Sequence, residues 1–125
     1  MTAGVFLLAA VGGGVGAALR FVIDGLVNRR VTSGYPWGTF VINATGSLIL
    51  GFLTGLADSS LLDASWLFIL GGGVMGGYTT FSTAMVDTVH MLQKRTYGRA
   101  LWNAFGMLVL TVALALAGLL LGRAL

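Results

Sequence analysis

The sequence is poor in the residues on which most water-soluble proteins rely. Among its 125 residues there is no cysteine, one histidine and one proline, and only 9% are charged. The lack of cysteine excludes disulfides, thiol chemistry and most soft-metal sites. A soluble domain normally carries about 25% charged residues, so the low charge content excludes water as the main solvent of the folded chain. The single histidine, His90, lies beside Lys94 and Arg95 and is interpreted as an interfacial residue.

Long apolar runs take the place of the missing charges, and 57% of the residues are hydrophobic. A bilayer core of ~30 Å needs roughly 20 helical residues to cross it, and four runs are long enough. We therefore predict an all-α membrane protein that forms one domain, residues 1–125, with four transmembrane helices. The predicted spans are residues 3–23, 37–57, 64–90 and 100–122, joined by short loops at 24–36, 58–63 and 91–99.

The basic residues lie at the ends of these runs, where they meet lipid headgroups, so the net charge of +3 does not indicate nucleic-acid binding. The first and third loops carry Arg29, Arg30, Lys94, Arg95 and Arg99. The positive-inside rule therefore favours both termini outside and these two loops in the cytoplasm.

Glycine pairs recur at a spacing of four residues. The pairs are Gly12 and Gly16, Gly51 and Gly55, Gly72 and Gly76, and Gly73 and Gly77. Such pairs let helix backbones approach closely in lipid. Packing within the chain and between chains is the expected role of most of them, and an oligomer is the natural consequence.

The stretch from Gly71 to Met85, GGGVMGGYTTFSTAM, is polar and glycine-rich at membrane depth. Adjacent glycines followed by two β-branched threonines hold a continuous helix poorly. A break here leaves carbonyls free for a hard monovalent cation or a water, and it presents the N-terminus of the next half-helix to an anion. The alternative is an unbroken helix whose hydroxyls bond back to their own turn.

Other polar side chains inside the runs are few. Asn43 acts either as a donor that lines a pore or as a polar link between helices. Asn103 and Thr111, eight residues apart, are predicted to share one helix face. No Asp or Glu occupies the centre of any span, and proton-coupled transporters need a titratable group there. The sequence thus favours a channel and not an enzyme or a proton-driven exchanger.

Three blocks of sequence resemble the Fluc (CrcB-type) fluoride channels across nearly the whole chain. They are GGGVGAALRF in the first span, GTFVINATGSLILG in the second and GGYTTFST in the third. The resemblance implies a passive channel that exports cytoplasmic fluoride across the inner (plasma) membrane. It also implies an antiparallel, dual-topology dimer with two pores at the subunit interface.

The resemblance also implies particular roles for residues. A structural sodium ion is expected at the centre of the dimer, held by the backbone carbonyls of Gly76 and Thr79. Asn43 matches a pore asparagine that donates to fluoride, Phe81 a pore ring whose edge faces the anion, and Arg20 a basic vestibule residue. The other expected pore residues are Thr80, Ser82, Thr83, Asn103 and Thr111.

The chain departs from the family pattern at two positions. Ala84 stands where a second phenylalanine is usual, and Met107 stands where a hydroxyl is often found. The uneven charge of the loops is a further departure, since an antiparallel homodimer needs one sequence inserted both ways. One hypothesis is therefore that the chain is half of a heterodimer with a paralogous subunit. The rival explanations are a homodimer that tolerates Ala84 and a deliberate substitution at that position. For the function, the alternatives to a fluoride channel are a small proton-coupled multidrug exporter and a membrane scaffold without conduction.

Overall fold

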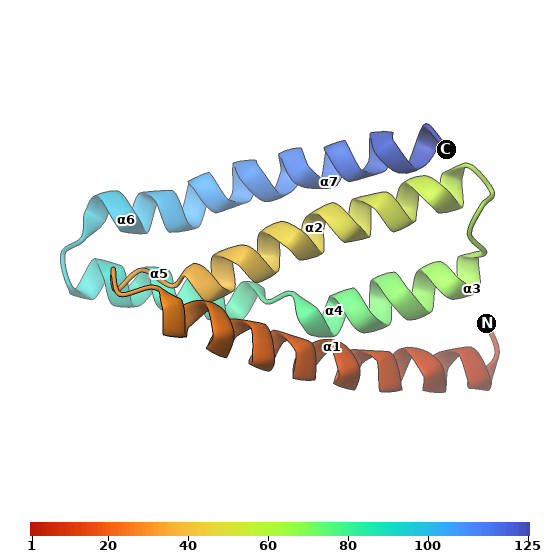
Figure 1. Cartoon of the computed structure of the whole chain (residues 1–125), viewed down its shortest axis with the longest axis horizontal. Helices are drawn as coiled ribbons and strands as arrows, with labels where there is room; N and C mark the ends of the chain where they lie inside the picture. The colour runs from red at the N-terminus through yellow and green to blue at the C-terminus, as the bar shows by residue number, and fades with distance from the viewer.

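The computed structural model describes all 125 residues, and they form four helical segments that run alternately up and down (Figure 1). Two segments are single α-helices, and the other two contain π-helical stretches, which are rare and often mark functional sites. The first two segments are α1 (Ala3–Arg30) and α2 (Trp37–Asp58). The third comprises α3 (Ala64–Leu67), η1 (Phe68–Met75), α4 (Gly76–Tyr78) and α5 (Phe81–Gln93), and the fourth α6 (Tyr97–Leu101), η2 (Trp102–Gly106) and α7 (Met107–Arg123).

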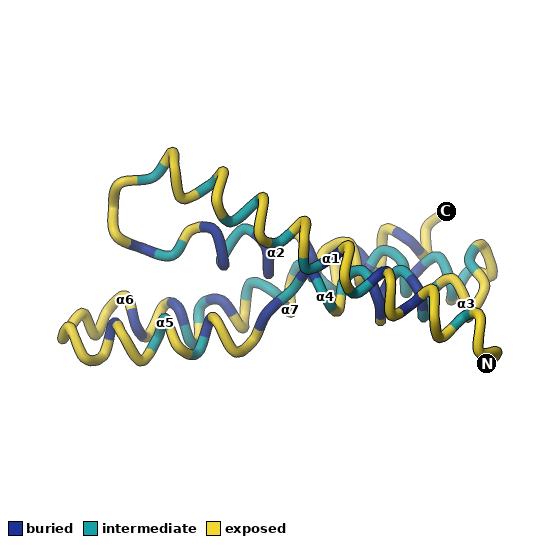
Figure 2. Tube along the Cα trace, turned by 90° about the horizontal axis from the view of Figure 1, so that it is seen from below, coloured by how far each residue is buried: buried dark blue, intermediate teal, exposed yellow.

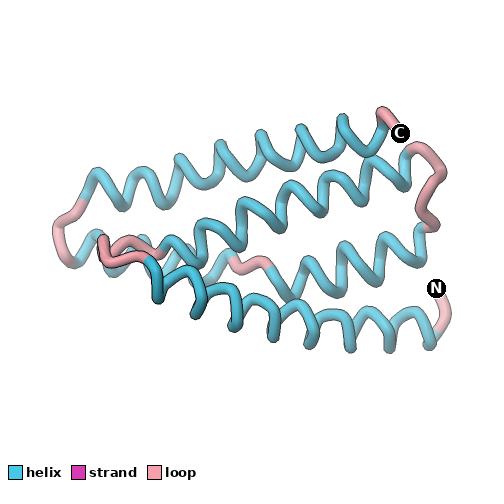
Figure 3. Tube along the Cα trace, in the orientation of Figure 1, coloured by secondary structure: helices cyan, strands magenta, loops and turns pink.

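Three of the segments are helices long and apolar enough to cross a membrane. They cover Ala3–Arg30, Trp37–Asp58 and Tyr97–Arg123. The third segment leaves the helical conformation at Thr79 and Thr80, seen as a short loop between α4 and α5 (Figure 3). The predicted helix break is therefore confirmed. A fourth membrane span remains a prediction, because neither half of this segment reaches the roughly 20 residues that a crossing helix needs.

The first loop is shorter than predicted. We expected a connection at 24–36, but α1 continues to Arg30. Asn28 donates to the Asp24 carboxylate one turn back, over 3.1 Å, and Arg29 and Arg30 complement the negative end of the helix dipole. These side-chain interactions favour two further turns of helix beyond the apolar run. The third connection is also shorter, since α5 ends at Gln93 and the next helix begins at Tyr97.

Glycines set how closely the segments pack. On α2, a Cβ added at Gly51 would collide with the Ala115 carbonyl of α7, and one added to Gly118 of α7 would collide with Leu48 of α2. On α1, a Cβ at Gly16 would collide with Val74 of η1. The predicted role of the spaced glycines in close helix packing is thus confirmed within the chain for Gly16 and Gly51. It is not confirmed for the pair Gly72 and Gly76, where an added Cβ would meet no atom closer than 3.6 Å. The role of the glycines between chains remains a prediction.

Few residues are buried, and most of the Cα trace is exposed or intermediate (Figure 2). Most large apolar side chains are exposed. Phe6, Phe105 and Val109 are each more than half exposed, for example. Apolar side chains exposed along long helices fit a lipid solvent and not water. The chain therefore has the surface of a membrane protein that crosses the bilayer several times.

A groove beside the helix break

The break between α4 and α5 is held by a side chain from α2. The Asn43 Nδ2 group donates to the Thr80 carbonyl over 2.8 Å, and the Thr80 N–H donates to Asn43 Oδ1 over 2.8 Å. In a continuous helix the Thr80 N–H would bond to the carbonyl of Gly76, four residues earlier. Asn43 therefore replaces a helical hydrogen bond, and the Gly76 carbonyl loses its usual partner.

Threonine side chains stabilise both ends of the break. The Thr79 hydroxyl donates to the Met75 carbonyl over 2.9 Å, which closes α4. The Thr80 hydroxyl accepts from the Thr83 N–H over 3.2 Å and so caps the start of α5. Thr80 Oγ1 also lies 3.0 Å from Thr83 Oγ1 and 3.4 Å from Ser82 Oγ. The N-terminus of α5 is thus surrounded by hydroxyl groups.

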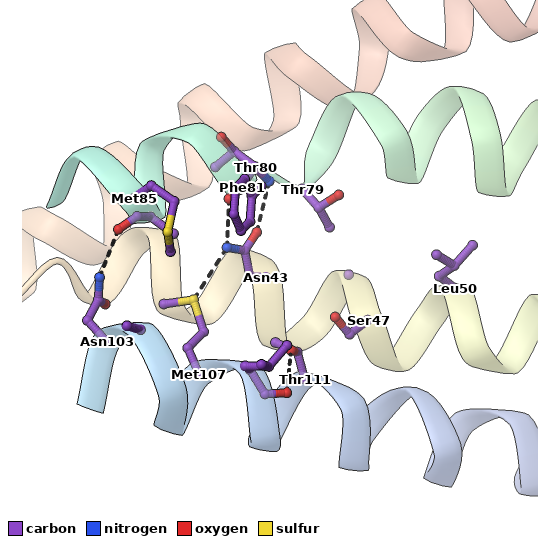
Figure 4. Close-up of a pocket in the computed structure, with 14 residues that line it drawn as sticks. Asn43, Ser47, Leu50, Thr79, Thr80, Phe81, Met85, Asn103, Met107 and Thr111 are labelled. Atoms are coloured by element: carbon purple, nitrogen blue, oxygen red, sulfur yellow. Dashed lines mark hydrogen bonds between the residues drawn. The ribbon is translucent and has the colours of Figure 1, made fainter. Parts of the chain in front are cut away.

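A groove of about 240 Å³ runs beside the break, between α2, α5 and the fourth segment (Figure 4). Most of its lining is apolar, and a few polar side chains converge on it, as in many ligand sites. It brings together six residues that the sequence placed in the pore or at the sodium site. They are Asn43, Thr79, Thr80, Phe81, Asn103 and Thr111.

The second amide hydrogen of Asn43 faces a weak acceptor. Asn43 Nδ2 lies 3.5 Å from Met107 Sδ, across the groove (Figure 4), and a thioether sulfur accepts hydrogen bonds poorly. Asn43 itself is only 8% exposed. Both interpretations of this residue therefore have a counterpart in the structure, because the amide links two helices and also lines the groove.

Asn103 is less available to bind an ion than the sequence indicated, because its amide is already hydrogen-bonded within the protein. Its side chain is fully buried, its Nδ2 group donates to the Ala84 carbonyl and to Thr88 Oγ1, and its Oδ1 accepts from the Tyr35 hydroxyl over 2.9 Å. Every polar atom of this amide has a protein partner. Thr111 also satisfies itself locally, by donating to the Leu108 carbonyl.

Tyr35 is the residue that sequence analysis missed. Its hydroxyl reaches the amide of Asn103, 68 positions further along the chain. Burial raises the pKa of the Tyr35 phenol, and the nearby Asp87 carboxylate raises this pKa further. The hydroxyl therefore stays a donor at any physiological pH. No local signal in the sequence identifies this pair, because the contact exists only once the first loop folds over α5 and α6.

The remaining predicted residues lie outside the groove. Arg20 and Thr83 line a second cavity of about 310 Å³ on the α1 side of the break, together with Asp24 and Thr39. Thr80 lines both cavities. Ser82 and Gly76 line neither, although Ser82 contacts Thr80. Ala84 is 2% exposed and lines the groove together with Phe81. A phenylalanine side chain at position 84 would therefore extend into the groove.

No cluster of three or more His, Asp or Glu side chains forms a metal site. The predicted sodium site would use carbonyl oxygens, which suit hard cations. The Gly76 carbonyl, deprived of its helical donor, has the chemistry for such a ligand, and Thr79 lies in the extended conformation. Two carbonyls on one chain make only part of a coordination shell.

These features define a class: a helical, multi-pass membrane protein with a polar break in one segment and a groove beside it. A family model described as "CrcB-like protein, Camphor Resistance (CrcB)" matches residues 7–122. The chain belongs to this family.

Relatives with curated names cover nearly the whole chain. "Fluoride-specific ion channel FluC 1" of Leifsonia xyli subsp. xyli is 46% identical over 98% of this chain and 89% of its own length. A "Fluoride-specific ion channel FluC" of Thermus thermophilus is 40% identical over 96% of both chains. "Fluoride-specific ion channel FluC 2" of Mycobacterium tuberculosis is 42% identical over 89% of this chain and 82% of its own length. All three names describe ion channels, a class without enzymatic activity.

Proposed function

We propose that this chain forms a fluoride-specific ion channel that lets cytoplasmic fluoride leave the cell down its gradient. The observation that carries the proposal is the naming of relatives at 40% and 46% identity, aligned over almost the full chain, as fluoride-specific channels. Fluoride enters cells as neutral HF and is trapped inside as the anion, so a passive channel is enough for export. The corresponding location is the inner (plasma) membrane.

The groove beside the break is the proposed fluoride path. An anion in a water-poor groove needs hydrogen-bond donors that are not already well paired. The Asn43 amide hydrogen that faces Met107 Sδ meets this need, because displacing a sulfur acceptor costs little. Thr111 and Asn103 line the same groove but are already paired, so Asn43 is the principal donor and these two residues shape the wall.

Phe81 forms the outer wall of the proposed path. Its ring is 78% exposed at the first position of α5, where a second subunit would cover it, and an aromatic edge carries the positive part of the ring quadrupole. Thr80, Ser82 and Thr83 place hydroxyls around the same helix N-terminus, whose dipole favours an anion. Arg20, in the neighbouring cavity, attracts anions towards the break.

A second subunit completes the channel in this proposal. A structural sodium ion would be held by the carbonyls of Gly76 and Thr79 together with those of an antiparallel partner. The bound ion would keep the third segment broken at this point. The freed Gly76 carbonyl and the open space beside the Gly76 Cα support this arrangement. Replacing sodium with a large organic cation during purification should then weaken the dimer.

The partner subunit is either a second copy or a paralogous chain. Five basic residues lie at the end of the molecule formed by loops 1 and 3. This bias would hold most copies in one orientation in the membrane. This observation favours a heterodimer with a chain of opposite bias. A homodimer requires that the same chain insert both ways despite the bias.

A single efflux experiment separates these possibilities. The purified chain is reconstituted alone into liposomes loaded with potassium fluoride, and release is followed with a fluoride electrode after valinomycin is added. Rapid fluoride release without chloride release is expected for a homodimeric channel, and a flux independent of pH would exclude a proton-coupled exporter. Release only after a paralogous chain is added would indicate a heterodimer. No release under either condition would refute the channel.

A further inference from the structure

The geometry points to a binding site for an anionic phospholipid at the end of the molecule formed by loops 1 and 3. The site is a cavity of about 310 Å³ between the start of α2 and the start of the fourth segment. Two tryptophans and an arginine form its walls. Its lining residues are Ser33, Tyr35, Trp37, Gly98, Arg99 and Trp102.

The cation of this cavity is held in place without a carboxylate partner. Arg99 Nη1 donates to the Ser33 carbonyl over 3.0 Å, which fixes the guanidinium and leaves other donors free. The one ion pair of the protein joins Arg123 and Asp58, at the opposite end. Asp87 shares a separate cavity with Arg99 but forms no ion pair with it. A fixed guanidinium with free donors suits the two oxygens of a phosphodiester.

The aromatic walls form a packed cluster, which we expect to lie at the depth of the lipid headgroups. Trp37 packs edge-on against Phe40 with ring centroids 5.3 Å apart, and Phe40 stacks on Trp102 at 6.2 Å. The Trp37 indole also donates to Ser33 Oγ over 3.1 Å. Tryptophan rings prefer the membrane interface because they combine an apolar body with one polar edge. The cluster thus places the Arg99 guanidinium where a lipid phosphate lies.

An apolar track leads away from the cavity along the fourth segment, and it distinguishes a lipid from a free anion. Its side chains are spaced by three or four residues, lie on one helical face and are all about half exposed or more. They are Trp102, Phe105, Val109, Val112, Leu116 and Leu120. Gly118 and Gly122, which pack on α2, lie on another face of the same helix. An acyl chain can follow the track while its phosphate stays at Arg99.

Net charge at this end supports the same ligand. Arg29, Arg30, Lys94 and Arg95 lie at this end besides Arg99, and they outnumber the two acidic residues nearby, Asp24 and Asp87. Basic pockets between helices at such a surface bind anionic headgroups. The site is therefore expected to select phosphatidylglycerol over zwitterionic phosphatidylcholine. This inference depends on the membrane position of the chain and not on fluoride conduction.

The test measures lipid retention. The full chain is purified in micelles that contain equal amounts of phosphatidylglycerol and phosphatidylcholine, and bound lipid is counted by native mass spectrometry. The wild type should retain phosphatidylglycerol, and Arg99→Gln should reduce this retention about tenfold, because a charge-assisted hydrogen bond is lost. Arg95→Gln removes the same charge from an exposed residue that does not line the cavity, and it should leave retention within about twofold.

Three outcomes would overturn the site. They are equal losses in Arg99→Gln and Arg95→Gln, retention of phosphatidylcholine as strong as that of phosphatidylglycerol, and complete displacement of the lipid by millimolar inorganic phosphate. If Arg99→Gln fails to fold, Arg99→Lys takes its place. Lysine keeps the charge but loses the planar fork, so it should retain part of the selectivity for phosphatidylglycerol, and full selectivity or none would contradict the proposal.

Discussion

Asn43 and Thr80 are joined by two reciprocal hydrogen bonds of 2.8 Å, one in each direction. The Asn43 side chain of α2 thus bonds both the N–H and the C=O of Thr80, where the third segment leaves the helical conformation. In a membrane, exposed backbone polar groups are tolerated only when protein or a water-filled cavity covers them. This pair of residues therefore makes the break possible at the depth where the groove lies.

The first prediction concerns Asn43. Replacing Asn43 with alanine leaves the buried N–H and C=O of Thr80 without partners, which should destabilise the protein by about 1–3 kcal/mol per group. Thermal unfolding of the purified protein in detergent measures the loss. Ser47→Ala is the matched control, because Ser47 lines the same groove on the same helix without a side-chain hydrogen bond. If both variants melt at the same temperature, Asn43 does not hold the break.

Two adjacent glycines should respond differently to the same substitution. A methyl group at Gly77 collides with the Gly13 backbone of α1, whereas one at Gly76 meets only the Gly71 carbonyl at 3.9 Å. Gly77→Ala should therefore cost about 1–3 kcal/mol through overpacking, and Gly76→Ala should leave the stability of the single chain nearly unchanged. Unfolding curves for the two variants compare them directly. A larger loss in Gly76→Ala would contradict the packing described for α1.

The third prediction concerns alkaline pH. The pKa of Tyr35 is raised above its ordinary value of 10.0, first by burial and then by Asp87. The folded state therefore keeps a proton that the unfolded state releases as the pH passes that ordinary value. The stabilising contribution is complete below the unfolded-state pKa and declines as the pH rises towards the folded-state pKa. Between these values the wild type should lose stability more steeply with pH than Tyr35→Phe.

The control for this pH dependence is Tyr97→Phe, because Tyr97 is 58% exposed. Its unfolding midpoint should follow that of the wild type at every pH. At neutral pH, Tyr35→Phe should itself be less stable by about 1–3 kcal/mol, since the buried Asn103 oxygen loses its donor. Parallel pH profiles for the wild type and Tyr35→Phe would show that the phenol is not the group responsible.

The fourth prediction separates conduction from folding. Phe81 is largely exposed in the single chain, so Phe81→Leu should change the stability of the chain little. In the proposed channel the same change removes an aromatic edge from the anion path, and fluoride efflux should fall about tenfold, which corresponds to about 1.4 kcal/mol. Phe105→Leu, exposed on the fourth segment away from the groove, is the control. Equal efflux from both variants would remove Phe81 from the path.

Much of the architecture could be read from the sequence. The helical character, the approximate limits of α2 and the break after the Gly76-Gly77 pair follow from local composition, because apolar length and helix propensity act within a few residues. The end of α1 could not be read in this way. Its last turns depend on the Asp24–Asn28 contact and on helix-end charges, which outweigh the end of the apolar run.

The sequence predicted which residues form the site but not which hydrogen bonds they make. Composition alone singled out Asn43, Asn103 and the Thr79–Thr80 pair as unusual polar residues at membrane depth. Whether each amide is free or paired depends on partners that are tens of residues away, as Tyr35 is from Asn103. Hydrogen bonding requires a distance of about 3 Å and a suitable angle, and no sequence spacing encodes those for separate segments.

The sequence by itself determined the solvent of this protein, its helical class and the position of the break. These properties follow from hydrophobicity and backbone propensity, which each residue carries with it. Only the tertiary structure decided that Asn43 holds the break, that Asn103 is fully paired and that Arg20 lies across the break from the groove. Those facts depend on how closely the glycine-lined helices approach, because that approach sets which polar groups come within bonding distance.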